Sequence, residues 1–206
     1  MTYADNDFWI AYGEYLDESR DRHLAAVNAL FEGEGLPVTG RRILDLGCGK
    51  FQEARSLLAP KDYLGVDVDP PEDLFGFKAD YRKEWGIVAD TALNPSKGDD
   101  ALFPDLIVSL FSVEITASAE PNRELYELAF RDVPTVKHIL SAGFYYTDKT
   151  GHNPVEEAGG LKSWQTLDLL DPHNKVFSES RLYVPAPSKL FGPNVVEVWK
   201  LLTRRV

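Results

Sequence analysis

The stretch Arg42-Ile43-Leu44-Asp45-Leu46-Gly47-Cys48-Gly49 decides the fold of this chain. Residues 43–46 have the pattern of a short buried strand that contains one acid, and the strand stops at a Gly-X-Gly turn. A helix is expected to follow, from about Phe51 to Leu58. Glycines let the backbone approach a ligand closely because they have no Cβ atom, and the first N–H groups of a helix favour a polar or anionic group. Strand, turn and helix together predict the first βα unit of a nucleotide-binding sheet.

The rest of the chain continues this alternation of strands and helices up to about residue 170, and two strands come last. Such a pattern predicts an α/β fold: a doubly wound, mostly parallel, seven-stranded sheet with an antiparallel C-terminal strand pair. The further expected strands are residues 63–69, 86–90, 105–111, 136–142, 176–183 and 194–202. The further expected helices are residues 5–33, in two pieces, 121–131 and 163–170.

The length of 206 residues favours one main domain, residues 41–206, preceded by a helical segment at residues 1–40. The first part of that segment is rich in aromatic residues, among them Trp9 and Tyr12. Two interpretations stay open. The aromatic side chains form a stripe that faces the core, or they belong to a lid that covers a ligand.

Charge and composition exclude several classes of function. The chain has 22 basic and 33 acidic residues, a net charge of −11, so nucleic acid, which requires a basic face, is not expected as a partner. Residues 181–206 are locally basic, which suits a solvated strand pair at a sheet edge or a binding patch. No window reaches the length of an apolar membrane span, and the acidic N-terminus does not resemble a secretory signal. The single cysteine excludes an intramolecular disulfide framework and a cysteine-rich zinc site. We therefore expect a cytoplasmic protein that does not bind membranes.

The chain resembles the class I S-adenosylmethionine-dependent methyltransferases, whose sheet is Rossmann-like. Four family motifs stand in order: a strand with an acid before Gly-X-Gly (residues 43–49), acids after strands two and three (Asp67 and Asp90), and an apolar fourth strand opened by an acid (residues 105–111). Asp67 lies 20 residues beyond Gly47, a spacing typical of an acid that binds ribose hydroxyls.

The resemblance implies S-adenosyl-L-methionine as the cofactor and a role for each motif residue. Asp67 would accept hydrogen bonds from the ribose, and Val68 would pack against the adenine. Asp90 and the Thr91 N–H would recognise the adenine edge, and Asp45 would lie near the amino group of the methionine portion. The implied cofactor-binding residues are Asp45, Gly47, Cys48, Gly49, Asp67, Val68, Asp90, Thr91, Leu110 and Phe111.

Other interpretations of these residues stay open. Asp45 also suits a buried acid that braces the glycine turn, and Asp67 and Asp90 also suit caps of turns. Cys48 fits a small packing residue better than a nucleophile, because no histidine is near it in sequence. Phe51 stands where the family often has a third glycine and is expected to crowd the start of the helix. Gln52 occupies the third glycine position of a dinucleotide fingerprint and argues against a dinucleotide enzyme.

The expected reaction is methyl transfer to a small-molecule acceptor by in-line displacement, in which positioning does most of the work. Glu114, three residues after the fourth strand, is the candidate to orient or deprotonate the acceptor. Trp9, Tyr12, Tyr145 and Tyr146 are candidates to contact it. The four histidines have no metal-ligand spacing, so no metal is expected. Two other classes stay open: a non-catalytic protein that binds the cofactor as a sensor or partner subunit, and a nucleotide-sugar or dinucleotide enzyme. The oligomeric state is not predicted.

Overall fold

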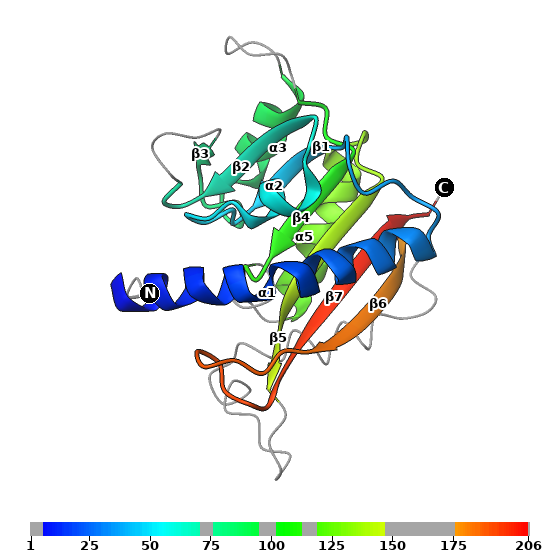
Figure 1. Cartoon of the computed structure of the whole chain (residues 1–206). Helices are drawn as coiled ribbons and strands as arrows, with labels where there is room; N and C mark the ends of the chain where they lie inside the picture. The colour runs from blue at the N-terminus through cyan, green and yellow to red at the C-terminus, as the bar shows by residue number, and fades with distance from the viewer. Residues whose placement is uncertain (1–5, 71–75, 95–101, 113–118, 147–175, 206) are drawn as a thin grey trace.

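A computed structural model describes residues 6–70, 76–94, 102–112, 119–146 and 176–205 of the chain (Figure 1). Four helices and seven strands lie in these ranges. The helices are α1 (Asn6–Gly33), α2 (Glu53–Leu58), α3 (Trp85–Leu93) and α5 (Ala119–Asp132). The strands are β1 (Arg42–Leu46), β2 (Asp62–Asp67), β3 (Gly76–Lys78), β4 (Leu106–Leu110), β5 (His138–Tyr146), β6 (Phe177–Pro185) and β7 (Val195–Arg204). The predicted helix at residues 163–170 falls outside the described residues.

The seven strands form one sheet in the order β3-β2-β1-β4-β5-β7-β6. Neighbouring strands from β3 to β5 are parallel, whereas β7 pairs antiparallel with both β5 and β6. The predicted α/β class and the antiparallel C-terminal strand pair are therefore confirmed. The central strands β1 and β4 are mostly apolar, as expected where both faces of the sheet are covered, and all five residues of β4 are buried.

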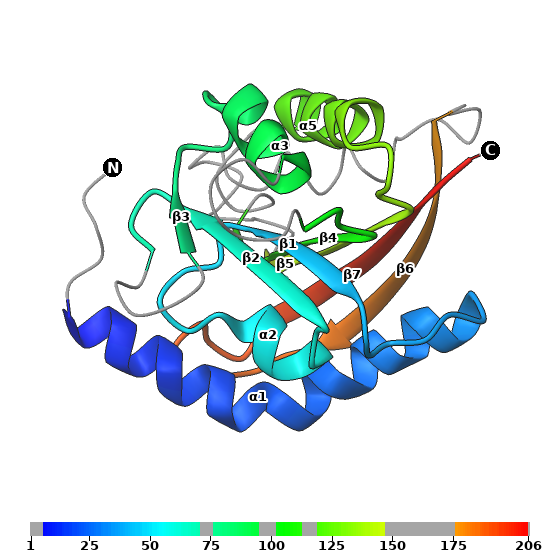
Figure 2. The same ribbon diagram turned by 90° about the horizontal axis from the view of Figure 1, so that it is seen from above.

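Helices cover both faces of the sheet (Figure 2). On one face, α1 and α2 pack on side chains such as Ile43 and Val108, and Val27 and Leu58 belong to the same core cluster. On the other face, α3 and α5 pack on a second cluster. That cluster includes Leu44, Ile107, Val88 and Tyr126. The alternation of Ile43 and Leu44 between the two clusters follows from the two-residue period of a strand.

Helix α1 is one continuous helix of 28 residues, so the prediction of two pieces is wrong. It runs across one face of the sheet (Figure 1). The polar stretch between its two apolar groups has no proline to break the helix, and its buried side chains Ser19 and His23 have hydrogen-bond partners. Ser19 is buried and accepts a hydrogen bond from Arg22 at 2.6 Å. No helix in the described ranges is long and apolar enough to cross a membrane.

A buried polar cluster fixes α1 to the sheet. Glu197 of β7 is fully buried, and one of its oxygens accepts hydrogen bonds from Tyr15, from Arg22 at 2.8 Å and from His23 at 3.0 Å. Its other oxygen accepts from the Trp199 indole N–H at 3.0 Å. The second ring nitrogen of His23 is bonded to Glu53 of α2. We call Tyr15, Arg22, His23, Glu53, Glu197 and Trp199 the Glu197 cluster.

The third strand is not where the sequence predicted it. Residues 86–90 were expected to be a strand, but they lie in α3, and the third strand is β3 at Gly76–Lys78. A short apolar run such as Ile87-Val88-Ala89 fits a buried strand as well as a helix, so its period does not decide between them. The buried residues of α3, at positions 85, 88, 89 and 92, have helical spacing.

Candidate functional site

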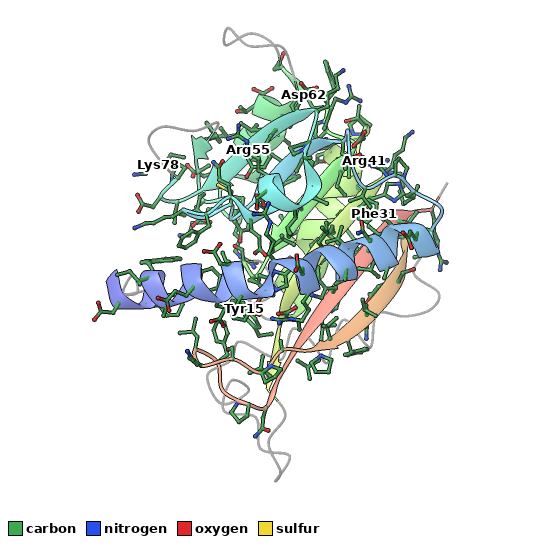
Figure 3. All side chains as sticks on the ribbon, in the orientation of Figure 1. Tyr15, Phe31, Arg41, Arg55, Asp62 and Lys78 are labelled. Atoms are coloured by element: carbon green, nitrogen blue, oxygen red, sulfur yellow. The ribbon has the colours of Figure 1, made fainter. Side chains whose placement is uncertain are left out.

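The carboxyl ends of the parallel strands meet at one edge of the sheet, where ligands of open α/β sheets bind. Leu46 at the end of β1 is in register with Val66 of β2, and Asp45 is in register with Val108 of β4. The glycine turn, residues 47–52, follows β1 at this edge. Figure 3 shows Lys78 at the carboxyl end of β3 and Asp62 at the amino end of β2, near opposite ends of these two parallel strands.

The two glycines of the turn have different functions. Both have positive φ, +73° at Gly47 and +56° at Gly49, which favours glycine. The Gly47 N–H donates to the Val66 carbonyl at 2.7 Å, and a Cβ atom on Gly47 would lie 1.8 Å from Ser112 Oγ. A Cβ atom on Gly49 would meet nothing within 4 Å among the described residues. Gly47 therefore lets the end of β4 approach, and Gly49 leaves a face of the backbone open.

We expect Gly47→Ala to destabilise the protein more than Gly49→Ala does. The left-handed backbone costs each alanine about 1–2 kcal/mol. Gly47→Ala adds the overlap with Ser112, for which overpacking costs about 1–3 kcal/mol. Urea denaturation of both variants measures the difference. Equal losses would mean that Ser112 moves aside freely and that the close approach does not require a glycine.

Asp67 lies at the end of β2, as predicted, and it contacts the glycine turn directly. Its Oδ2 accepts a hydrogen bond from the Gly49 N–H at 3.1 Å, and its Oδ1 accepts from the Asp69 N–H at 3.0 Å. Val68, beside it, is 42% exposed. The structure therefore brings two of the predicted motifs together at the sheet edge, with an apolar side chain exposed next to a carboxylate.

Asp45 is buried beneath the turn. It is 2% exposed, and its Oδ2 accepts a hydrogen bond from the Tyr63 hydroxyl at 2.7 Å. Burial raises the pKa of Asp45 to about 7, against the lowering effect of the Tyr63 hydrogen bond, and the charges of Glu53 and Asp67 add to the increase. This environment fits the interpretation that Asp45 braces the glycine turn. It also means that Asp45 is not fully ionised at neutral pH.

Cys48 packs against β2. Its side chain is 7% exposed, and a Cβ atom on Gly65 of β2 would lie 2.8 Å from Cys48 Sγ. Burial, helped by the charges of Asp45 and Asp67, raises the pKa of the thiol well above its usual range. The thiol therefore lacks the low pKa of a nucleophilic cysteine.

The interpretation of Asp90 as the acid after the third strand is wrong, because Asp90 lies on α3. Its side chain is exposed and accepts a hydrogen bond from Asn94 Nδ2 at 2.7 Å. Thr91 is also within α3, where its hydroxyl donates to the Ile87 carbonyl at 2.8 Å. Both residues form local helix contacts and do not follow a strand, so the basis for assigning them to the adenine edge is lost.

Asp80 is the acid that follows the third strand. It comes two residues after β3, and the N–H of the residue before it, Ala79, donates to the Asp67 carbonyl at 2.9 Å. The Lys83 ammonium lies 2.8 Å from Asp80 Oδ2, and this hydrogen bond lowers the pKa of Asp80. Sequence reasoning missed Asp80 because β3 has only three residues, too few for a periodic signal.

The end of β4 bends sharply. Phe111 has a φ of +55°, its N–H donates to the Ala142 carbonyl at 2.7 Å, and its ring stacks on Phe144 with centroids 4.4 Å apart. Leu110 and Phe111 reach the predicted edge, but both side chains are buried in the core beneath α1. A bulky residue in the left-handed region is uncommon and is a feature of strained functional sites.

Ser112 is the residue of this bend that touches the glycine turn. Its hydroxyl lies against Gly47 and 3.0 Å from the Tyr81 hydroxyl. Tyr81 is buried and directly follows Asp80. A Tyr81–Ser112 contact therefore joins the ends of β3 and β4 beneath the turn. No motif in the sequence indicates it, because the two residues are 31 positions apart.

The first half of α1 packs against the glycine turn. The ring centroids of Trp9 and Tyr12 lie 6.3 and 5.9 Å from that of Phe51, and Lys50 Nζ lies 5.5 Å from the Trp9 ring centroid. Phe51 was expected to crowd the start of the helix. Instead α2 begins at Glu53, after a left-handed Gln52, and Phe51 turns toward α1.

Three predicted acceptor-site side chains are not described. Glu114 falls outside the described residues. Tyr145 and Tyr146 end β5, but their side chains are not placed. Among the described residues, no group of three or more histidine, cysteine, aspartate or glutamate side chains is arranged to hold a metal ion.

Comparison with known proteins identifies the fold. No protein-family model matches the sequence, and no curated protein matches it. Among solved structures, the chain is similar to the N-methyltransferase NodS from Bradyrhizobium japonicum WM9, in complex with S-adenosyl-L-homocysteine, with 14% identity and a TM-score of 0.53 over 97% of this chain and 99% of that one. It is also similar to the plantazolicin methyltransferase BpumL, in complex with the same product, with 16% identity and a TM-score of 0.52 over 98% and 92%.

A third similar structure is a cyclopropane-fatty-acyl-phospholipid synthase-like protein from Lactobacillus casei ATCC 334, with 14% identity and a TM-score of 0.54 over 89% of this chain and 91% of that one. The strand order, the antiparallel β7 and these matches define the fold. The chain has the class I S-adenosylmethionine-dependent methyltransferase fold.

Proposed function

We propose that this protein is an S-adenosylmethionine-dependent methyltransferase that acts on a small-molecule acceptor. The observation that carries the proposal is the hydrogen bond between the Gly49 N–H and Asp67 Oδ2 at the carboxyl edge of the sheet. It unites the glycine turn and the acid after the second strand in the arrangement that an adenosine-containing cofactor requires.

The described residues suit the chemistry of this cofactor. A carboxylate has about four lone-pair sites, and two backbone hydrogen bonds leave Asp67 able to accept the ribose hydroxyls. Val68 offers an exposed apolar surface for the adenine, and Asp80 replaces Asp90 as the acid for its amino group. Gln52 is 3% exposed, and its amide nitrogen has no hydrogen-bond partner among the described residues. A carboxylate oxygen of the methionine portion is a suitable acceptor for this amide.

When bound, S-adenosylmethionine supplies a methyl group already activated by its sulfonium, so the protein needs mainly to position the acceptor and exclude water. Trp9 and Tyr12 of α1 lie against Phe51, which supports the proposal that residues 1–40 act as a lid over the site. Tyr145 and Tyr146 remain the proposed acceptor contacts, and Glu114 remains the group proposed to orient or deprotonate the acceptor. The proposed reaction is an in-line displacement at the sulfonium methyl. The single cysteine favours a cytoplasmic location.

We expect Asp67→Ala to weaken S-adenosylmethionine binding by about 1.5–3 kcal/mol, the range for a hydrogen bond to a charged group. Titration calorimetry measures the dissociation constant. Asp62→Ala is the matched control, because Asp62 lies on the same strand at the opposite edge of the sheet and should bind with unchanged affinity (Figure 3). Equal affinities for the wild type and Asp67→Ala would remove Asp67 from the site.

Turnover separates an enzyme from a sensor that binds the same cofactor. The wild type is incubated with S-adenosylmethionine and a library of small metabolites, and S-adenosylhomocysteine is measured. An enzyme forms this product with at least one acceptor. Binding without product across the whole library would favour the non-catalytic alternative, and binding of a dinucleotide but not of S-adenosylmethionine would overturn both.

A further inference from the structure

The Glu197 cluster extends from the sheet to the candidate site through His23. This side chain is fully buried, and its imidazole lies between two carboxylates. Its Nε2 is 3.0 Å from Glu197 Oε1, and its Nδ1 is bonded to Glu53 Oε1. Glu53 is the first residue of α2 and comes four positions after Gly49. One imidazole therefore joins α1, the sheet and the first residue of α2, which directly follows the glycine turn.

The charges around His23 favour its doubly protonated form. Glu53 from α2 and Glu197 from β7 face the ring, and Tyr15 and Arg22 from α1 share the Glu197 oxygen. The Phe111 and Trp199 rings flank it and carry no charge. Only a protonated imidazole donates from both nitrogens, and both of its neighbours here are acceptors. Burial alone would lower the pKa of His23, but the hydrogen bonds and charges of Glu197 and Glu53 raise it to about 9.

Helix α1 touches the glycine turn on both sides of Gln52. Before it, Phe51 packs on Tyr12, and a Cβ atom on Gly13 would lie 3.1 Å from the Phe51 ring. After it, Glu53 is bonded to His23. Gln52 itself has a φ of +46°. A non-glycine residue holds such a strained conformation only where its surroundings impose it, and here α1 supplies the contacts on both flanks.

We propose that His23 is a positioning residue for the cofactor site: by holding Glu53, it fixes Gln52 and the glycine turn in the conformation from which Gly49 bonds to Asp67. The inference rests on the proposed function and deepens it, since it makes the docking of α1 and the binding of cofactor one linked event. A cluster that merely anchors α1 would affect stability and leave the turn unchanged.

The test compares His23→Gln with the wild type in binding S-adenosylhomocysteine by calorimetry from pH 6 to pH 10. Glutamine keeps one donor but cannot carry the charge or bridge both carboxylates. At pH 7 we expect binding about tenfold weaker, the lower end of the loss of a hydrogen bond to a charged group. The two dissociation constants should converge above about pH 9, because the wild-type imidazole is then neutral. Titration of the ligand itself affects both proteins equally and does not alter this ratio.

His138→Gln is the matched control. His138 is also buried, but it starts β5 at the opposite edge of the sheet and contacts Thr203. It should keep the wild-type affinity and its pH profile. If His23→Gln is folded and binds like His138→Gln at every pH, the proposal is overturned.

Hydrogen exchange of residues 47–52 without ligand gives a second readout that does not depend on the proposed function. Faster exchange in His23→Gln and in Glu53→Gln than in His138→Gln supports the positioning role, and unchanged exchange overturns it. If His23→Gln does not fold, Glu53→Gln carries both measurements from the other side of the same bond. A wild type that binds no S-adenosylhomocysteine would overturn the proposed function, and hydrogen exchange would still decide the role of His23.

Discussion

Replacing Glu197 with glutamine is expected to lower the free energy of unfolding by about 3–5 kcal/mol, the cost of removing one partner from a buried ion pair. Glu197 is fully buried, and its two oxygens accept hydrogen bonds from four side chains. Glutamine has one acceptor oxygen instead of two, and its NH2 group would face side chains that are themselves hydrogen-bond donors. It also leaves the charges of Arg22 and His23 without their common counter-ion.

Urea denaturation of Glu197→Gln measures this loss, and Glu179→Gln is the control. Glu179 lies on the edge strand β6, where it pairs with Arg181 at 2.7 Å. The Glu179 and Arg181 side chains are 13% and 19% exposed, so solvent partly screens this pair, and Glu179→Gln should cost less than Glu197→Gln. A loss below about 1 kcal/mol for Glu197→Gln would show that water or rearrangement replaces the lost charge, and it would contradict the role of Glu197 as the anchor of α1.

The elements that the sequence predicted well are those with a strong local pattern. The strand at residues 43–46 and its Gly-X-Gly turn combine a buried apolar run with a conformational requirement, and the structure has both. The two last strands were placed to within a few residues. Residues 86–90 failed because a short apolar run has no decisive period, and the division of α1 failed because a distant carboxylate satisfies its polar middle.

The site residues also differ in this respect: those with a local sequence pattern were predicted, and those that depend on distant contacts were not. Asp67 was found because its distance from the glycine turn follows from the length of a βαβ unit, which is a local property. Asp80 was missed with its three-residue strand, and Ser112 and Glu197 were missed because their partners are far away in sequence. Glu197 and His23 are 174 positions apart, and neither has a pattern that points to the other. Contacts of this kind depend on the register between β5 and β7, which pairs Phe144 with Glu197.

The stability of the protein should fall as pH rises from about 6.5 to 9, and His23→Gln should lose most of this dependence. The pKa of His23 is raised from 6.5 to about 9 in the folded state, so the stability it contributes is fully present below pH 6.5 and is lost as pH passes through 9. A shift of this size corresponds to a contribution on the order of 3 kcal/mol.

The pKa of Glu197 is lowered to about 2 because the bonds and charge of His23, with Arg22 and Tyr15, outweigh the effect of burial. Its contribution is present above pH 4.5 and is lost only as pH falls through 2.

Denaturation of the wild type and of His23→Gln at several pH values measures this dependence as the difference between their free energies of unfolding. The comparison with His23→Gln is needed because a second group also titrates. Asp45, with a pKa raised to about 7, lowers the stability of both proteins as pH rises from about 4 to 7, and this effect cancels in the difference. The difference should be largest near pH 6 and should shrink toward pH 9.5. A constant difference would mean that His23 is neutral in the folded protein, in which case it cannot donate to Glu53 and Glu197 together. The shrinking difference, if it coincides with the loss of cofactor affinity, would tie the charge of this one buried imidazole to both the docking of α1 and the geometry of the glycine turn.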